Sequence, residues 1–511
     1  MASRKVALAL AAMAGAALLA GKMEIAMAQP PQELLGKWGY IVLGKGGKGS
    51  WFGYKTEAGT MNFNENYTIV NNYKESADRC PDENYCMKSA HETLSYSVGE
   101  SGVIVIGETV KCFLSESKTV ILCDGTTGME RSGEKFFIAG LKLDTQTQYE
   151  DSALLGEYFT AYYEKDLLGE DRGKNRLGSV IGTIESSEDG LEITSASGWE
   201  NDEKGGDKIH RVNFGPIPLQ FSPDGSFQLG GFATGYLGIQ RNMAVVSNPS
   251  QFYPDLGDDF AVHVLLRRND RDYSQQDLSG RWAFVGFGDK AAQTYRAEIG
   301  IINCDSNGSC VFSSKVTPVN GTSKFHVATR TITVSSTGEL NGFHLSTNKP
   351  HISGAIGDNG NTMILLMNED SQSINDRLLA VAVRYPDGNL PGFSDLELKE
   401  VLAPDTASPG EKITISYTVE NKGEEAATKS ARVSFRLVKQ DGSEDMVLGT
   451  QRVPKLDHGE LFNGSKNLRL KKTLTPGNYS LRVSLDPTNA IFESREDNNE
   501  KILEISITSG S

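Results

Sequence analysis

Short runs of strand length, either apolar throughout or alternating between apolar and polar residues, recur along most of the chain. Examples are Val103–Ile106, Thr331–Val334 and Met363–Leu366, and the runs are separated by Gly, Asn, Asp and Ser. Alternation with a period of two is the pattern of a strand that buries one face. No long stretch has the period of an amphipathic helix, so the pattern predicts an all-β protein.

A short opening motif occurs three times and divides the chain. Each copy is followed, after many strand-like runs, by a closing strand of alternating pattern, and this recurrence in a fixed order predicts three tandem modules at residues 33–144, 152–270 and 276–386. The opening motifs are Leu34-Leu35-Gly36-Lys37-Trp38, Leu154-Leu155-Gly156-Glu157-Tyr158 and Leu278-Ser279-Gly280-Arg281-Trp282, and the closing strands are Phe136–Leu143, Phe260–Arg268 and Leu378–Tyr385.

Each module must protect its sheet edges, either by closing into a barrel or by stacking two sheets. The Gly-x-Trp of the opening motif resembles the first strand of lipocalins and avidin-like barrels. That resemblance implies a barrel in which the glycine lets the chain bend and the aromatic ring plugs one end. An aromatic core anchor at the start of any β-domain explains the motif as well, so barrel-like and sandwich modules both remain open.

After residues 385–393 the sequence becomes more charged and its strands more evenly spaced. The prolines and glycines of residues 385–393 mark a domain boundary. Seven evenly spaced strands follow, which predicts an immunoglobulin-like sandwich at residues 394–508. Tyr479 follows Pro476 and Gly477 at the start of the sixth strand, where such sandwiches carry a tyrosine corner. The predicted strands are 395–401, 412–420, 431–438, 446–450, 466–474, 479–486 and 501–507.

Motifs spread over this last module give it a specific resemblance. They are Asp395-Leu396, Pro409-Gly410, Thr418-Val419-Glu420-Asn421-Lys422-Gly423, Leu456–Gly459, Gly477-x-Tyr479, Asp486 and Glu493–Asn499. Together they resemble the bacterial cell-adhesion-related domain, CARDB. The resemblance implies an immunoglobulin-like extracellular domain, usually appended to surface or secreted proteins and without catalysis of its own.

The N-terminal residues predict export. Arg4 and Lys5 precede an apolar run that is short for a membrane span, and Ala26 and Ala28 form an A-x-A cleavage site. Residues 1–28 are therefore expected to be a signal peptide. No second apolar run has the length of a membrane span, so we expect a secreted, periplasmic or cell-surface protein with no integral membrane segment after cleavage.

The charge of the chain limits its partners. The whole sequence carries a net charge of −15, and the signal peptide contributes three cations and one carboxylate, a net +2, so the mature chain carries −17. A surface of this sign repels nucleic acid. We therefore expect an extracellular protein or polysaccharide partner and no nucleic acid.

Six cysteines fall into pairs that are close in sequence. In an oxidising compartment this spacing favours three local disulfides, although six thiols formally allow fifteen pairings. A zinc site would need a CxxC or HxxxH spacing, which the sequence lacks. The pairs are Cys80 with Cys86, Cys112 with Cys123, and Cys304 with Cys310, the last around an Asn-Gly turn.

Two groups of residues are candidate sites, and neither is catalytic. The aromatics Trp38, Trp51 and Tyr54 could bind sugars or apolar ligands if exposed, or could pack in a core. The carboxylates Asp486, Glu493 and Asp497 could cap backbone donors, which we favour, or gather around Ca²⁺. No other cofactor is expected. Nucleophile-elbow, HExxH, phosphate-loop and dinucleotide motifs are absent from the sequence.

These observations favour an exported, non-enzymatic binding or adhesion-type protein that contacts a surface, a polymer or a protein. Two alternatives stay open. The modules could carry small molecules in barrel interiors, or the chain could be a polysaccharide-processing enzyme with a CARDB accessory domain, which would need two facing carboxylates in one cleft.

Overall fold

The computed structural model describes residues 30–508 except 46–53, 78–85, 100–101, 108–109, 126–134, 147, 167–174, 189, 203–208, 232, 249–258, 270, 291–293, 319–322, 344–349, 369–376, 386–389 and 489. The expected signal peptide at 1–28 lies outside the described residues. The chain forms two compact units, one of Met1–Gly99 and Ile104–Pro386 and one of Glu100–Val103 and Asp387–Ser511.

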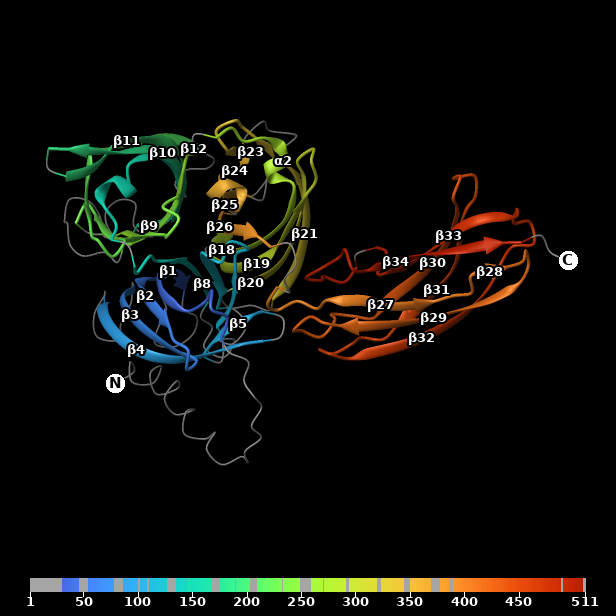
Figure 1. Cartoon of the computed structure of the whole chain (residues 1–511). Coiled ribbons are helices and arrows are strands. Elements are labelled where there is room, and N and C mark those ends of the chain that lie inside the picture. The colour runs from blue at the N-terminus through green and yellow to red at the C-terminus, as the bar shows by residue number, and fades with distance from the viewer. Residues whose placement is uncertain are drawn as a thin grey trace, which may run out of the picture. The chain divides into compact units, whose positions relative to one another are not determined.

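The first module is a closed barrel of eight antiparallel strands in which each strand pairs with its neighbour in sequence and β8 returns to β1 (Figure 1). Closure resolves the choice between a barrel and a sandwich for this module. Its strands are β1 (Gly36–Lys45), β2 (Tyr54–Phe63), β3 (Thr68–Ala77), β4 (Cys86–Val98), β5 (Ile104–Ile106), β6 (Val110–Leu114), β7 (Val120–Asp124) and β8 (Lys135–Lys142).

The second module is also a ring, because its first strand pairs with both the second and the last. The fourth strand is split at Gly215–Pro216 into β12 and β13, which both pair with β11. A short 3₁₀ helix, η2 (Asp151–Ala153), precedes the barrel. The strands are β9 (Gly156–Asp166), β10 (Asn175–Ser187), β11 (Gly190–Asp202), β12 (Ile209–Phe214), β13 (Ile217–Phe221), β14 (Ser226–Leu229), β15 (Ala233–Leu237), β16 (Met243–Asn248) and β17 (Asp259–Arg267).

The third module has the same order of strands, with its fourth strand split at Ile332 into β21 and β22. The helix α2 (Gln275–Leu278) precedes the barrel, and η3 (Asp358–Gly360) connects β24 to β25. The strands are β18 (Gly280–Lys290), β19 (Thr294–Cys304), β20 (Ser309–Pro318), β21 (Lys324–Thr331), β22 (Thr333–Val334), β23 (Glu339–Phe343), β24 (Pro350–Gly357), β25 (Thr362–Asn368) and β26 (Arg377–Arg384).

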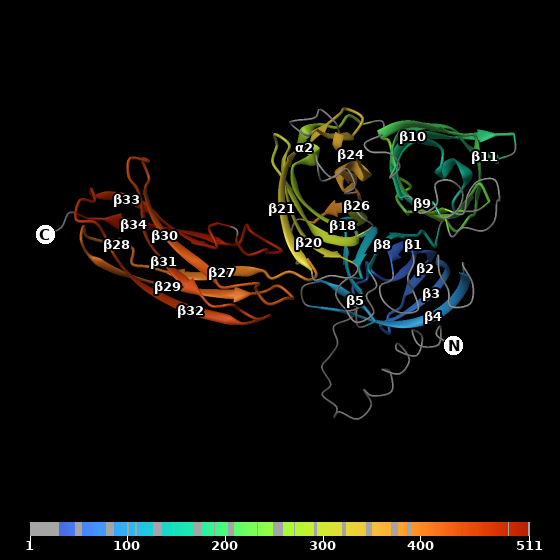
Figure 2. The ribbon, with the colours of Figure 1, turned by 180° about the vertical axis from the view of Figure 1, so that it is seen from behind.

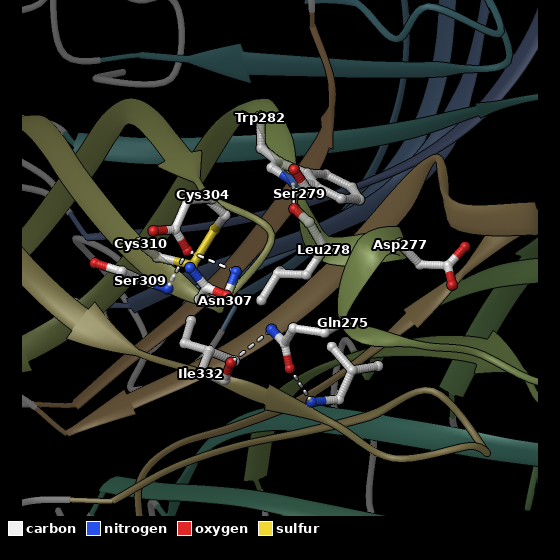
Figure 3. The surroundings of a disulfide bond; sticks show 12 residues. Gln275, Asp277, Leu278, Ser279, Trp282, Cys304, Asn307, Ser309, Cys310 and Ile332 are labelled. Carbon is white, nitrogen blue, oxygen red and sulfur yellow. Dashed lines mark hydrogen bonds between the residues drawn. A yellow bond between two sulfur atoms is a disulfide. The ribbon is translucent and has the colours of Figure 1, made fainter.

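The side chain of Gln275 bridges the split in this strand (Figure 3). Its Nε2 donates to the carbonyl oxygen of Ile332 at 2.8 Å, and its Oε1 accepts from the backbone N–H of Val334 at 3.2 Å. The amide of one side chain thus pairs with two backbone groups at the break in the strand. The two edges of the sheet are consecutive parts of one strand, so the third module is also barrel-like.

The opening motif begins each barrel in the same way. Gly36, Gly156 and Gly280 have φ values of 105°, 132° and 113°, which a residue with a side chain rarely adopts. The residue after each glycine accepts a backbone hydrogen bond from the end of the closing strand. These bonds run from Leu143 to Lys37, from Arg268 to Glu157 and from Tyr385 to Arg281.

The aromatic residue of each motif is buried at one end of its barrel under a cation from the last strand. Lys142 lies over Trp38 at 5.8 Å from the ring centroid, Arg267 over Tyr158 at 5.9 Å, and Arg384 over Trp282 at 4.0 Å. Each cation also donates to a backbone carbonyl in the turn before the motif: Glu33, Ala153, and both Asp277 and Ser279. A cation over a ring is attracted by the negative face of the π-system. The same cation–ring contact therefore covers one end of each of the three barrels.

Two of the three expected disulfides lie among the described residues. Cys112–Cys123 joins β6 to β7, and Cys304–Cys310 joins β19 to β20. The cysteines of each pair are directly opposite in the ladder, and the Asp305 carboxylate accepts backbone N–H bonds from Asn307 and Ser309 in the turn (Figure 3). The hairpin expected around Asn-Gly is therefore confirmed.

We predict that non-reducing peptide mapping of the exported protein recovers three short linked pairs, Cys80–Cys86, Cys112–Cys123 and Cys304–Cys310. Cys80 lies outside the described residues, so the first pair rests on its spacing and on the oxidising compartment. A free thiol, or a peptide linking the first barrel to the third, would contradict the prediction.

The last module stacks two sheets, one of order β27-β29-β32 and one of order β28-β34-β33-β30-β31. One expected strand is misplaced: β32 begins at Leu461, not at 466, because Phe462, Gly464 and Leu468 of this segment turn toward the other sheet. The strands are β27 (Leu396–Leu402), β28 (Thr406–Ala407), β29 (Lys412–Asn421), β30 (Ala431–Lys439), β31 (Asp445–Val453), β32 (Leu461–Arg469), β33 (Gly477–Leu485) and β34 (Glu500–Ile507).

Alternating residues of the facing strands form the core of this module. The buried residues of β29 and β33 include Ile413, Ile415, Tyr417, Val419, Leu481, Val483 and Leu485. Tyr479 makes the expected corner, since its hydroxyl donates to the carbonyl oxygen of Thr475 at 2.9 Å and lies 2.9 Å from Glu444 Oε2. The immunoglobulin-like sandwich predicted from the sequence is therefore present.

The fragment 394–511 is expected to fold alone, and within it Tyr479→Phe should lower the free energy of unfolding by about 1 to 3 kcal/mol, because a buried hydrogen bond is lost. Tyr417→Phe is a matched control, since the Tyr417 hydroxyl is buried without a hydrogen-bond partner and its removal should cost nothing. Urea melts of the three fragments measure both effects. Equal midpoints for Tyr479→Phe and the parent would contradict the corner, and a melt without cooperativity would contradict independent folding.

Candidate functional site

Trp38, one of the aromatic residues considered as a binding surface, does not lie on the surface. This side chain is fully buried, and its Nε1 donates to the carbonyl oxygen of Leu34 at 2.9 Å. The barrel end closes over the ring, so Trp38 cannot stack on an external ligand. Trp51 and the side chain of Tyr54 lie outside the described residues.

The interior of the first barrel holds a polar cluster instead. Alternate residues of β1 point inward, and Tyr40 meets Glu57 of β2 and Asn71 of β3. Lys55 Nζ lies 3.2 Å from Glu57 Oε2 and 3.0 Å from Glu75 Oε2. One cation thus bridges two buried carboxylates inside the barrel, and the Tyr40 hydroxyl donates to one of them.

Burial and charge together set the protonation of this cluster. Burial raises the pKa of Glu57, and the neighbouring Lys55 ammonium opposes that effect. Burial by itself would lower the pKa of Lys55, but Glu57 and Glu75 outweigh it and raise the pKa. Burial and Glu57 raise the pKa of Tyr40 well above its usual value. The tyrosine therefore stays a neutral donor and the lysine stays charged at every physiological pH.

The other two barrels carry a cation at the same interior position. Lys55, Arg176 and Arg296 each lie opposite the residue eight positions after the opening glycine. Arg296 Nε lies 3.8 Å from Glu298 Oε2, and Arg176 Nη1 lies 3.7 Å from Glu164 Oε1. Each barrel therefore encloses a cation–carboxylate pair at an equivalent place in the fold.

The sequence reasoning missed these pairs, although a signal for two of them exists. Residues 54–59 read Tyr-Lys-Thr-Glu-Ala-Gly and residues 295–300 read Tyr-Arg-Ala-Glu-Ile-Gly. The second module has Asn-Arg-Leu-Gly-Ser-Val at 175–180, without the glutamate. A repeat search on the second strand of each module could have found them.

The second barrel holds an aromatic cluster of its own. The rings of Tyr162 and His263 lie 5.4 Å apart, and Phe214 meets Tyr162 edge-on at 6.4 Å. Burial lowers the pKa of His263 to about 4, so it is neutral at physiological pH. Phe214 lies directly opposite Ala196, which packs in the interior with Tyr162, yet its side chain is 43% exposed. Phe214 is therefore the exposed member of this aromatic cluster.

The carboxylates considered for Ca²⁺ accept hydrogen bonds in the last module. Asp486 Oδ2 accepts from the backbone N–H of Ile491 at 2.6 Å, and Glu493 Oε2 accepts from that of Leu396 at 2.7 Å. Asp497 is bound by the guanidinium of Arg495 at 3.1 Å. Two of the three thus cap backbone donors, and the third forms an ion pair.

The environments of the buried Glu493 and the half-buried Glu496 favour the protonated forms of both side chains. Burial raises the pKa of Glu493 well above its usual value, and the nearby Glu496, Asp395 and Asp486 add to the effect. Burial and the Asp486 carboxylate raise the pKa of Glu496 to about 8. Among the residues that the structure describes, no group of three or more His, Cys, Asp or Glu side chains is placed to hold a metal ion.

The fold thus defines an all-β chain of three barrels followed by an immunoglobulin-like sandwich. Residues 393–502 match the family model of CARDB, and this part of the chain is a CARDB domain. The resemblance inferred from the sequence motifs is confirmed there. No curated protein matches the chain.

Several solved structures are similar to the chain over about a quarter of its length. A CARDB domain from Pyrococcus furiosus, described in complex with di-metal ions, is 22% identical, with 25% of this chain and 100% of that chain covered and a TM-score of 0.20. A domain of a putative cell surface protein from Methanosarcina acetivorans is 28% identical over 23% of this chain and 93% of that chain, with a TM-score of 0.19. A β-glucosidase from Listeria innocua is 19% identical over 25% and 18%, with a TM-score of 0.18.

Within the described part of the chain, no helix has the length and apolar character needed to cross a membrane. The CARDB domain and the two disulfides are consistent with an extracellular or surface location.

Proposed function

We propose that the protein is exported and non-enzymatic, and that it contacts a surface, a polymer or a protein partner outside the cytoplasm. The observation that carries the proposal is the CARDB domain at residues 393–502, which suggests an adhesion-related extracellular protein. The disulfides of the first and third barrels support it, because such bonds persist in oxidising compartments.

Fractionation of cells that produce the full chain tests the first half of the proposal. The mature protein should appear outside the cytoplasm and begin at Gln29. Purified protein should then bind to intact cell envelopes, and removal of residues 387–511 should reduce that binding. A cytoplasmic protein, or one that binds no envelope, would overturn the proposal, and the release of reducing sugar from a polysaccharide would overturn its non-enzymatic part.

A second candidate function is small-molecule carriage inside the barrels, and Phe214 favours it for the second barrel. An inward-facing aromatic residue that is 43% exposed, beside Tyr162 and His263, offers stacking surface to a small ring compound.

Native mass spectrometry of the purified protein tests this candidate. Retained mass should correspond to a small organic compound, and Phe214→Ala should release it. Protein that carries no ligand, and that takes up none from a panel of aromatic compounds, would contradict carriage.

A further inference from the structure

The outer face of the larger CARDB sheet carries an unusual row of residues. In this sheet β34, β33, β30 and β31 lie side by side (Figure 2). Reading across the strands, directly opposite residues form the row Ile502–Arg482–Arg436–Val447. All four side chains are exposed. Two arginines therefore stand next to each other on neighbouring strands.

A second pair of arginines lies on the same face. Arg432 of β30 is directly opposite Arg452 of β31, and both side chains are exposed. Like charges directly opposite each other in a sheet are destabilising. Four arginines therefore gather on one face of a domain whose chain carries a net charge of −15. At Arg436 the Asp445 carboxylate already relieves part of this repulsion, and an anion bound across Arg432 and Arg452 would relieve the rest.

Few carboxylates oppose these charges. Among the outward positions of β33, β30 and β31, all of them described, Asp445 is the one carboxylate, and it pairs with Arg436. Glu500 and Glu504 stand on β34, where the hydroxyls of Ser484 and Ser480 donate to them. The part of the face that holds the arginines is thus cationic.

Hydroxyls and aliphatic side chains complete the face. Ser484, Ser434 and Thr450 form the next row across the same three strands. Val447 and Ile502, at the ends of the arginine row, are 64% and 52% exposed. The two arginine pairs are four residues apart along β30, which is about 13 Å in a strand.

We propose that this face of the CARDB domain, defined by Arg432, Arg436, Arg452 and Arg482, docks an acidic polysaccharide. Guanidinium groups bind carboxylates through two parallel hydrogen bonds. Pairs of cations at a regular spacing, with hydroxyls between them and aliphatic groups beside them, match a polymer that repeats acid groups, hydroxyls and C–H faces. This inference names the partner class for the proposed contact function and rests on it.

Binding of the full-length protein to immobilised polygalacturonate tests the proposal, with neutral dextran and poly-glutamate beside it. Arg436→Ser/Arg482→Ser and Arg432→Ser/Arg452→Ser should each weaken binding to polygalacturonate at least tenfold. Binding should also fall as salt rises, because exposed charges are screened. The matched control is Lys412→Ser/Arg469→Ser, which removes a directly opposite pair of exposed cations from the other sheet and should leave binding unchanged.

The results of these binding experiments distinguish a failure of the docking face from a failure of the proposed contact function. Equal loss in the control, or no loss in either arginine variant, would overturn the docking face and leave the contact function intact. Binding to envelopes but not to polygalacturonate would overturn the polysaccharide class, as would tighter binding to poly-glutamate. Protein that binds neither envelopes nor polymers would overturn the proposed function itself. Melting curves of every variant are the control for folding, and each should show the same cooperative transition as the parent protein.

Discussion

Replacement of Asp289 by Leu should destabilise the third barrel by about 3 to 5 kcal/mol, because a buried ion pair loses one partner. Asp289 of β18 and Arg377 of β26 lie opposite each other, both are 1% exposed, and Arg377 Nη2 lies 2.9 Å from Asp289 Oδ2. The Tyr163 hydroxyl donates to the same carboxylate at 3.3 Å. Without Asp289 the guanidinium would stay buried beside an aliphatic side chain.

The double variant Asp289→Leu/Arg377→Met should recover most of that loss. Replacing a buried ion pair by apolar side chains of similar volume is often neutral or stabilising, since both desolvation costs disappear. A large cost for the single variant and a small one for the double variant would together identify the loss of the Asp289–Arg377 ion pair on one side only as the cause.

Hydrogen exchange of peptides from β18 and β26 in the intact protein measures this effect barrel by barrel. Asp445→Leu is the matched control, because it breaks the exposed pair with Arg436, and exposed ion pairs contribute little to stability. Unchanged protection in Asp289→Leu, or a double variant as unstable as the single one, would refute the expected cost.

The CARDB domain should lose stability as the pH rises from 5 to 9. Burial and neighbouring carboxylates raise the pKa of Glu496 to about 8 and that of Glu493 well above its usual value. An acid whose pKa is raised by folding stabilises the native state while it is protonated. Its contribution is complete below the unfolded pKa, near 4.5, and is lost as the pH passes through the folded pKa near 8.

The expected loss is about 4 kcal/mol, because the folded pKa of about 8 lies about 3 units above pH 5 and each unit corresponds to about 1.4 kcal/mol. Thermal melts of the fragment 394–511 at pH 5, 7 and 9 measure it. Glu496→Gln should flatten the profile and stabilise the fragment at pH 9, whereas the exposed Glu400→Gln should leave the profile unchanged. A melting temperature that rises between pH 5 and 9 would show that these carboxyl groups ionise freely in the fold.

Local patterns were enough to predict much of this protein. The opening glycines, the Asn-Gly hairpin between Cys304 and Cys310, and the alternating core of β29 and β33 all follow from residues close in sequence. Turn residues and side-chain alternation act within a few residues, so they leave a readable signal. The start of β32 was misplaced because Gly464 lies at an inward position, where it interrupts the apolar pattern of the strand.

The sequence by itself determined the strands, the three repeats and the CARDB domain, because periodicity and recurring motifs express them directly. Only the tertiary structure decided which face of a strand lies inside. Residues 54–59 alternate between polar and small side chains, and an open sheet would turn Lys55 and Glu57 toward water. Closure of β1 to β8 encloses them instead, while Thr56 and Ala58 are buried on the outer face. Alternation distinguishes two faces but cannot say which one a closed barrel encloses, so the interior ion pairs appear only when the ring is complete.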